Sequence, residues 1–295
     1  MKHLFILNPV AGKGKTRRLI PDIRDYFRGG GEEYAIEITK YPGHATEIAA
    51  EYSSKEDYRI YSVGGDGTLN EVLNGMAGSE SSLADIPGGS GNDFLKSVTG
   101  GKSLKDIVKN TIEGAEMVMD LAKVNDKYFI NIASLGFDAQ VVYKTLKYKK
   151  LPFISGRIAY MMGILASVVQ CANYDMEIVI DGEAQKTRAL LVAAGNGRYY
   201  GGGMLALPKA GLNDGLLEIC LVEEKKRFDV LHLFPRYMRG AHESIQGVHF
   251  YRGRRLEIHL PDPVPMNLDG EVLIVKNAVF EIIKDGIRFV KPIIT

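Results

Sequence analysis

Cysteine is scarce in this sequence. Only Cys171 and Cys220 occur in 295 residues, and they lie far apart and fit no metal-binding or redox spacing. Both stand in apolar stretches, so we expect them to be small buried hydrophobic residues. A chain of this length can bury a core without disulfides, and the pattern suits a reducing cytoplasm.

An excess of charge of one sign is also missing. Lys and Arg total 37, Asp and Glu total 36, and the net charge is +1. This balance argues against nucleic acid as a general partner. It still leaves room for a local basic site that binds phosphate.

The sequence has no long hydrophobic run. Its longest apolar stretch, 158–172, is shorter than the roughly 20 residues that span a bilayer, which predicts no transmembrane segment. The N-terminal segment lacks the apolar region and cleavage site of a signal peptide. We therefore expect a cytoplasmic protein, whose work on any lipid would be peripheral and transient at the inner membrane surface.

The first third of the chain alternates strand-like and helix-like segments. This order predicts an α/β domain with a parallel sheet, in which ligands gather beyond the carboxyl ends of the strands. The strand-like runs are 4–7, 34–39 and 59–63, and the helical patterns are 16–27, 45–52 and 69–76.

From about residue 120 the pattern becomes mainly β. Hairpin connections are predicted at 124–128 and 181–183, and one helix, near 156–171, interrupts the β-type runs. We expect a nucleotide-binding α/β domain at 1–120 and a mainly antiparallel β domain, which binds the substrate or lipid, at 121–295.

The first Gly-rich segment, 8–16, follows the first strand and resembles a phosphate-binding loop. Its small residues let backbone N–H groups approach an anion, and Lys13 and Lys15 add positive charge. It is not a Walker A loop, because Pro9 stands where the first glycine is required. The alternative is a simple strand-to-helix turn with a basic start.

The second segment, 63–71, follows another short apolar strand. Glycines on both sides of Asp66 let the backbone turn sharply and touch a ligand. Asp66 can reach a ribose hydroxyl, a phosphate through Mg²⁺, or a loop amide, and Thr68 can cap the next helix. Read alone, Gly-Asp-Gly is also a common turn.

The third segment, 86–94, again lies between a strand-like run and a helix pattern. Its three glycines and Ser90 suit a loop that lies close to a ligand, and Asn92 or Asp93 would cap the following helix. On its own residues, this segment is equally well explained as a turn.

The helix pattern near 156–171 allows two interpretations. Its apolar stripe fits core packing or a lipid-access surface. The preceding Lys144, Lys147, Lys149 and Lys150 fit a solvated basic face or a contact with anionic head groups.

In this order and spacing, the three Gly-rich segments resemble the diacylglycerol kinase catalytic domain family, and more narrowly its bacterial soluble lipid kinase branch. The resemblance continues through 131–138, 195–203, 208–216 and 269–271, and so covers nearly the whole chain. Gly-Gly-Asp-Gly-Thr alone is shared with NAD kinases. The later Asn-Asp-Gly-Leu and Asp-Gly-Glu segments favour the lipid branch.

The resemblance implies a kinase with its active site in the cleft between two domains. It implies ATP as donor, Mg²⁺, and a lipid alcohol as acceptor, with diacylglycerol as the default. Glu271 matches the general base of the family, and Asp66 and Asp93 match acidic residues near the phosphates and Mg²⁺. The nucleotide contacts implied are Asn8, Pro9, Val10, Ala11, Gly12, Lys13, Thr39, Gly65, Asp66, Gly67, Thr68, Leu69, Asn70, Glu71 and Ser90.

The resemblance also implies a second, structural Mg²⁺ site, built mostly from backbone carbonyls at Gly211, Asp214 and Leu216. The residues alone predict only a hairpin there, because Asn-Asp-Gly is a standard turn signal. A tight turn can present several carbonyls to a hard cation, so both interpretations stay open.

Two features depart from the commoner pattern of the family. Ser90 stands where Thr is usual, which keeps a hydroxyl. The chain stops at Thr295, whereas many members continue and pack a C-terminal segment on the first domain. We expect that packing to be absent here.

Two other functions are considered beside the lipid kinase. An NAD kinase would need a second nucleotide pocket, and the later motifs of that family are not recognised. A non-catalytic nucleotide- or lipid-binding regulator would not need Asp66, Asp93 and Glu271 together. The sequence leaves open which lipid is the acceptor, ATP against another nucleotide, and whether the protein is a homodimer.

Overall fold

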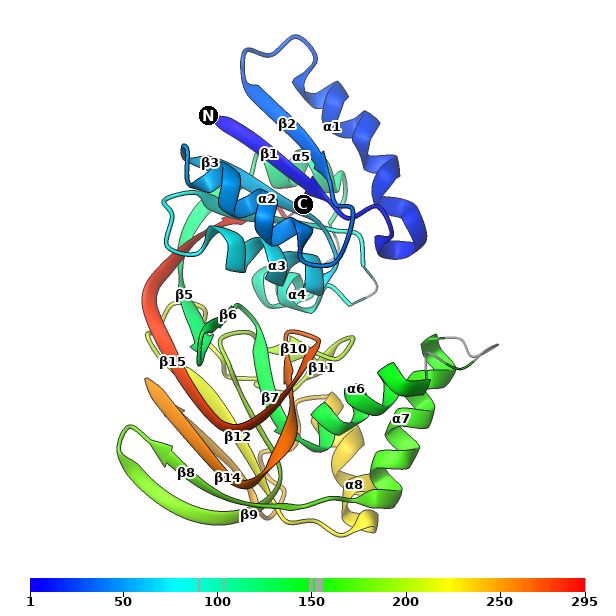
Figure 1. Ribbon diagram of the computed structural model, residues 1–295, viewed down its shortest axis with the longest axis vertical. Coiled ribbons are helices and arrows are strands. Elements are labelled where there is room, and N and C mark those ends of the chain that lie inside the picture. The colour runs from blue at the N-terminus through cyan, green and yellow to red at the C-terminus, as the bar shows by residue number, and fades with distance from the viewer. Residues whose placement is uncertain (90, 103, 149–150, 152–155, 295) are drawn as a thin grey trace.

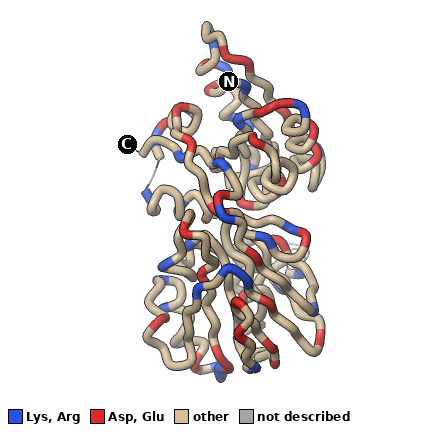
Figure 2. Tube along the Cα trace, turned by 90° about the vertical axis from the view of Figure 1, so that its left-hand side faces the viewer, with Lys and Arg blue, Asp and Glu red and all other residues tan. Residues whose placement is uncertain are grey.

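The computed structural model describes residues 1–89, 91–102, 104–148, 151 and 156–294, and for 156–157 the backbone alone. The described chain forms two lobes, one above the other, connected by long strands (Figure 1). Basic and acidic residues are mixed over both lobes (Figure 2), in agreement with a net charge of +1. Among the described helices, none is long and apolar enough to cross a bilayer.

The first lobe is built on a parallel sheet with the strand order β2-β1-β3-β4. Leu4 and Ile6 pack toward α2 and α3, whereas Phe5 and Leu7 pack toward α1 and α5. Helices therefore cover both faces, and the predicted α/β fold is confirmed. The elements are β1 (Lys2–Leu7), a kinked 3₁₀ segment (Ala11–Arg18), α1 (Leu19–Phe27), β2 (Glu33–Ile38), α2 (His44–Ser53), β3 (Tyr58–Gly64), α3 (Asp66–Met76), β4 (Ser82–Pro87), α4 (Asp93–Thr99) and α5 (Ile107–Ile112).

The second lobe is mainly antiparallel β, as predicted. Both expected hairpins are present, because Val124 pairs with Lys127 and Ile180 pairs with Glu183. The strands are β5 (Ala115–Val124), β6 (Lys127–Phe129), β7 (Ile132–Gly136), β8 (Tyr174–Ile180), β9 (Glu183–Gly195), β10 (Tyr199–Tyr200), β11 (Met204–Leu205), β12 (Leu217–Glu223), β13 (Val248–Gly253), β14 (Arg255–Leu268) and β15 (Glu271–Lys291).

The second lobe has more helix than the sequence predicts. The expected helix is α7 (Gly156–Gln170), but α6 (Phe137–Tyr148) and α8 (Arg227–Met238) accompany it. The prediction of one helix was therefore wrong. Pro235 inside α8 is a residue that argues against helix, and α6 follows β7 with no intervening turn residue beyond Gly136.

The last strand overturns one further expectation. β15 starts beside β14 in the second lobe and ends in the first, where Phe289 pairs in parallel with Leu83 of β4 (Figure 1). Phe289 and Val290 are completely buried there. A C-terminal segment does pack on the first lobe, because the final residues of β15 extend its sheet.

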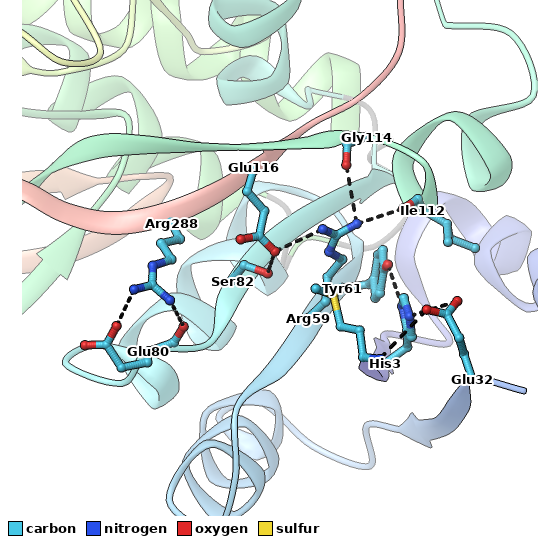
Figure 3. A network of polar contacts seen from close by, with 11 residues as sticks. His3, Glu32, Arg59, Tyr61, Glu80, Ser82, Ile112, Gly114, Glu116 and Arg288 are labelled. Atoms are coloured by element: carbon cyan, nitrogen blue, oxygen red, sulfur yellow. Dashed lines mark hydrogen bonds and ion pairs between the residues drawn. The ribbon is translucent and has the colours of Figure 1, made fainter.

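Polar contacts fix this crossing at the amino end of the first sheet (Figure 3). Arg59 on β3 donates to the carbonyl oxygens of Ile112 and Gly114, at 2.8 and 3.3 Å, and to Glu116 of β5 at 2.9 Å. Arg288 of β15 donates to the carboxylate of Glu80 at 2.6 Å. The two strands that connect the lobes are thus tied to the first lobe by side chains.

Candidate active site

The Gly-rich turns after β1, β3 and β4 lie against one another at the carboxyl edge of the sheet. The N–H of Gly89 donates to the carbonyl of Gly64 at 3.0 Å. A Cβ atom at Gly12 would lie 2.0 Å from the carbonyl oxygen of Gly88, and one at Gly89 would lie 2.7 Å from Cα of Gly65. Only glycine permits this approach, so the three motifs form one surface.

The turn after β1 exposes its backbone. Gly12, Lys13 and Gly14 have φ values of 56°, 60° and 84°, which places three successive residues in the left-handed region. Asn8 ties the turn to the second motif, because its Nδ2 donates to Oγ1 of Thr68 at 3.0 Å. Successive N–H groups in such a turn make a concave site for an anion.

Asp66 and Asp93 begin α3 and α4, where helix N-termini favour negative charge. Oδ1 of Asp66 accepts the N–H of Asp93 at 2.7 Å. Oδ2 of Asp93 accepts the N–H of Gly202, in the second lobe, at 2.7 Å. Burial, and then the charge of Asp93, raise the pKa of Asp66 above its ordinary range. The pair thus joins two helices and both lobes.

Lys96 completes this cluster and was not singled out in the sequence. Its Nζ lies 2.7 Å from Oδ1 of Asp93, three residues earlier on α4. The Asp-x-x-Lys spacing on a predicted helix was the available signal. Two adjacent carboxylates, one of them in a raised-pKa environment, are the oxygen donors that fit a divalent cation.

The hairpin between β14 and β15 brings the third acidic motif to the boundary between the lobes. Asp269 is buried, and its carboxylate accepts N–H groups of Ile130 and Ile132 at 3.0 and 3.1 Å. It also accepts Nδ2 of Asn70 at 3.1 Å, from the helix that Asp66 begins. Burial raises the pKa of Asp269 to about 6. Asn70 is therefore a link between the lobes.

Glu271 follows this anchored turn. It opens β15, is 44% exposed, and lies 3.8 Å from Nζ of Lys127. Asp269, two residues earlier, is bonded to Asn70, four residues after Asp66. The carboxylate predicted as general base is thus held at the boundary of the lobes, on a hairpin bonded to the helix of the acidic pair.

The other residues expected to contact nucleotide differ in exposure. The side chain of Val10 is 77% exposed, whereas Leu69 is 1% exposed within the core. Glu71 accepts the N–H of Ala45 at 3.2 Å and so positions α2. Thr39 donates its N–H to the carbonyl of Leu7 at the end of β1. Pro9 and Ala11 lie in the first turn, Gly67 lies in the first turn of α3, and Ser90 lies outside the described residues.

The residues of the expected second Mg²⁺ site do lie together. A Cβ at Gly211 would be 2.5 Å from Oδ2 of Asp214, and the N–H of Leu216 donates to Oδ1 of Asp214 at 3.1 Å. Arg252 forms an ion pair with the same carboxylate. In the described part of the chain, no group of three or more His, Cys, Asp or Glu is arranged to hold a metal. Positive charge at Asp214 is already supplied by Arg252, so this cation site stays a prediction.

The chain is similar to known proteins over nearly its whole length. Residues 2–124 match the family described as diacylglycerol kinase catalytic domain, and residues 131–290 match the YegS C-terminal NAD kinase beta sandwich-like domain. A diacylglycerol kinase of Staphylococcus carnosus (strain TM300) is 31% identical over 270 residues, covering 90% of this chain and 87% of the relative. One of Bacillus subtilis (strain 168) is 28% identical over 272 residues, covering 90% and 88%.

A solved structure shares the fold. A crystal structure from Bacillus anthracis str. Sterne, provisionally named a diacylglycerol kinase, has a TM-score of 0.78 and 25% identity, covering 98% of this chain and 95% of that one. The matched motifs, the identity over most of both chains and the shared fold agree. The chain belongs to the diacylglycerol kinase family.

Proposed function

We propose that this protein is an ATP-dependent lipid kinase that transfers the γ-phosphoryl group to the hydroxyl of diacylglycerol and yields phosphatidic acid. The observation that carries the proposal is the acidic pair Asp66–Asp93, bonded to Gly202 of the second lobe at a surface of three Gly-rich turns. The curated relatives named diacylglycerol kinase support the choice of acceptor.

The first lobe would bind the nucleotide, in a domain of residues 1–120. The left-handed turn of Gly12, Lys13 and Gly14 offers backbone N–H groups to the phosphates, and the exposed Lys13 adds a positive charge. Asp66 and Asp93 are the residues that would hold Mg²⁺. When bound, Mg²⁺ supplies charge neutralisation at the phosphoryl oxygens.

The second lobe, residues 121–295, would present the acceptor and its base. As the bond forms between the lipid oxygen and the γ-phosphorus, the bond from that phosphorus to ADP breaks. Glu271 accepts the hydroxyl proton, a contribution of about 10²–10⁴-fold. Asp269 and Asn70 act as positioning residues, because their bond holds the hairpin on which Glu271 lies.

The acceptor would be reached at a membrane surface. Met161, Leu165 and Val169 project from one face of α7 and are 56, 61 and 63% exposed. Their spacing of four residues makes a continuous apolar stripe on a helix. Exposed apolar surface of this kind is typical of a contact with lipid or with a partner.

Transfer of radiolabel from ATP to diacylglycerol in mixed micelles tests the proposal. Glu271→Gln should lose transfer and keep nucleotide binding. Glu183→Gln is a matched control, since Glu183 opens β9 after the same Asp-Gly-Glu turn but on an exposed hairpin. Full activity of Glu271→Gln would contradict the assigned base. Phosphorylation of NAD without any lipid product would contradict the assigned acceptor.

A further inference from the structure

A cavity in the second lobe lies between the three helices α6, α7 and α8 and the neighbouring strands. Its empty space is about 590 Å³, counting the part that opens to solvent, which falls in the range of small-molecule pockets. Most of its wall is apolar. The apolar lining includes Phe137, Val141, Ile164, Leu191, Met204 and Leu233.

One carboxyl group interrupts this apolar wall. Asp138 is 8% exposed, and within the described chain neither of its oxygens has a hydrogen-bond partner. Burial raises the pKa of Asp138, and the neighbouring hydroxyls of Ser134 and Tyr200 offset this effect only in part. A buried carboxyl without a partner is costly, so its presence indicates a ligand that supplies the missing contact.

The cavity touches both halves of the candidate active site. Gly201 lines it, and the next residue, Gly202, donates to Asp93 at 2.7 Å. Asn267 also lines it, and Oδ1 of Asn267 accepts the N–H of Gly270, next to Glu271, at 3.0 Å. A ligand in the cavity therefore lies one residue away from the acidic pair on one side and from the hairpin of the base on the other.

We propose that this cavity binds the glycerol ester and the adjoining hydrocarbon of the acceptor lipid, with Asp138 as the polar contact of the ester or hydroxyl oxygens. The inference rests on the proposed function and deepens it. The same helix serves both sides of the path. Tyr160 and Ile164 of α7 line the cavity, whereas Met161 and Leu165 are exposed on its outer face. A chain can thus pass from the bilayer along α7 into the cavity.

A purely structural role for Asp138 is the competing explanation. Asp138 lies in the first turn of α6, where a helix N-terminus favours a carboxylate. That role accounts for the position of the residue, but it predicts no link between Asp138 and lipid. The experiments must therefore separate lipid affinity from stability and from ATP affinity.

Filling the cavity is the first test. Val142→Phe adds bulk at the cavity wall, and Val118→Phe makes the same change at a 43% exposed position on β5. With dioctanoylglycerol as acceptor, Val142→Phe should raise the lipid KM about tenfold, because overpacking displaces the ligand, and leave the ATP KM unchanged. Val118→Phe should match the wild type. An unchanged lipid KM in a folded Val142→Phe protein overturns the proposal.

Removing the carboxyl is the second test. Asp138→Leu and Asp138→Asn should raise the lipid KM by about tenfold and by less, respectively, while the ATP KM stays the same. An amide can still share one hydrogen bond, which explains the partial rescue. Equal loss toward both substrates, in step with a lowered melting temperature, would assign Asp138 to structure alone and overturn its role at the lipid.

A binding measurement separates this inference from the proposed function. Dioctanoylglycerol should raise the melting temperature of the wild type and of Glu271→Gln, and should not raise that of Val142→Phe. If the wild type binds dioctanoylglycerol but transfers no phosphoryl group, the proposed function fails and the cavity stands. If transfer occurs and Val142→Phe binds lipid as the wild type does, the cavity assignment fails alone.

Discussion

Replacing Asp269 with Asn should change how the stability of the protein depends on pH. The carboxyl of Asp269 is buried, and burial raises its pKa from 3.8 to about 6. All three of its partners are donors, namely Nδ2 of Asn70 and the N–H groups of Ile130 and Ile132. These donors favour the charged form, but they do not offset the loss of hydration.

The sign and size follow from proton linkage. The folded state holds the proton of Asp269 more tightly than the unfolded state. The resulting stabilisation is fully present below pH 3.8 and is lost as the pH rises through about 6. A shift of roughly two pKa units corresponds to about 3 kcal/mol. The Asn side chain cannot titrate, so the free energy of unfolding of the wild type, minus that of Asp269→Asn, should fall by about 3 kcal/mol across this range.

Urea denaturation of both proteins at several pH values between 4 and 7 measures this difference. The difference is needed because burial also raises the pKa values of Asp66, Asp85 and Asp138. The Asp269→Asn variant would also lose an accepted hydrogen bond, but that cost does not vary with pH. Asp181→Asn makes the same change in an exposed turn. A wild-type-minus-variant difference that stays constant or grows with pH would refute the reasoning.

Three further outcomes are expected. Gly12→Ala should raise the ATP KM far more than Gly14→Ala, since its Cβ would lie 2.0 Å from a carbonyl oxygen, whereas that of Gly14 meets nothing closer than 3.9 Å; equal effects would contradict the close packing of the loops. Arg59→Ala should lower the free energy of unfolding in urea by about 2 kcal/mol, and no loss would show that its network does not hold the lobe. Leu165→Glu should reduce flotation with phosphatidylglycerol vesicles while Ile283→Glu, 38% exposed on β15, should not; equal binding would remove α7 from the membrane contact.

The parts of the fold that were predicted correctly depend on local patterns. The hairpins at 124–128 and 181–183 follow from turn residues between β-type runs, and the parallel sheet follows from strand-turn-helix repeats. The final crossing of β15 could not be predicted in this way. Its pairing of Phe289 with Leu83 joins residues far apart in the chain, and a β-type run alone does not say which sheet it extends.

The candidate site shows the same division. Gly-rich turns announce close backbone approach, and Gly12 and Gly89 make such approaches in the structure. Asn70 was expected at the nucleotide, yet its side-chain amide reaches Asp269, 199 positions later. No pattern around Asn70 distinguishes these two roles, because the role is decided by which lobe packs against α3.

The two Asp-Gly-Glu turns in this chain separate local conformation from function. Asp181 and Asp269 have φ values of 47° and 46°, and Gly182 and Gly270 have φ values of 93° and 97°. The backbones are therefore nearly alike. Their surroundings are not, because Asp181 accepts N–H groups of Arg254 and Arg255 on an exposed hairpin, whereas Asp269 is buried against Asn70.

The glutamates that follow these turns inherit this difference. Glu183 is exposed at an outer hairpin, and Glu271 lies where the lobes meet. If the tripeptide acted only as a turn, Gln at either position would have the same effect on phosphoryl transfer. A large loss confined to Glu271→Gln means that the position of the turn, rather than its sequence, makes the carboxylate a base.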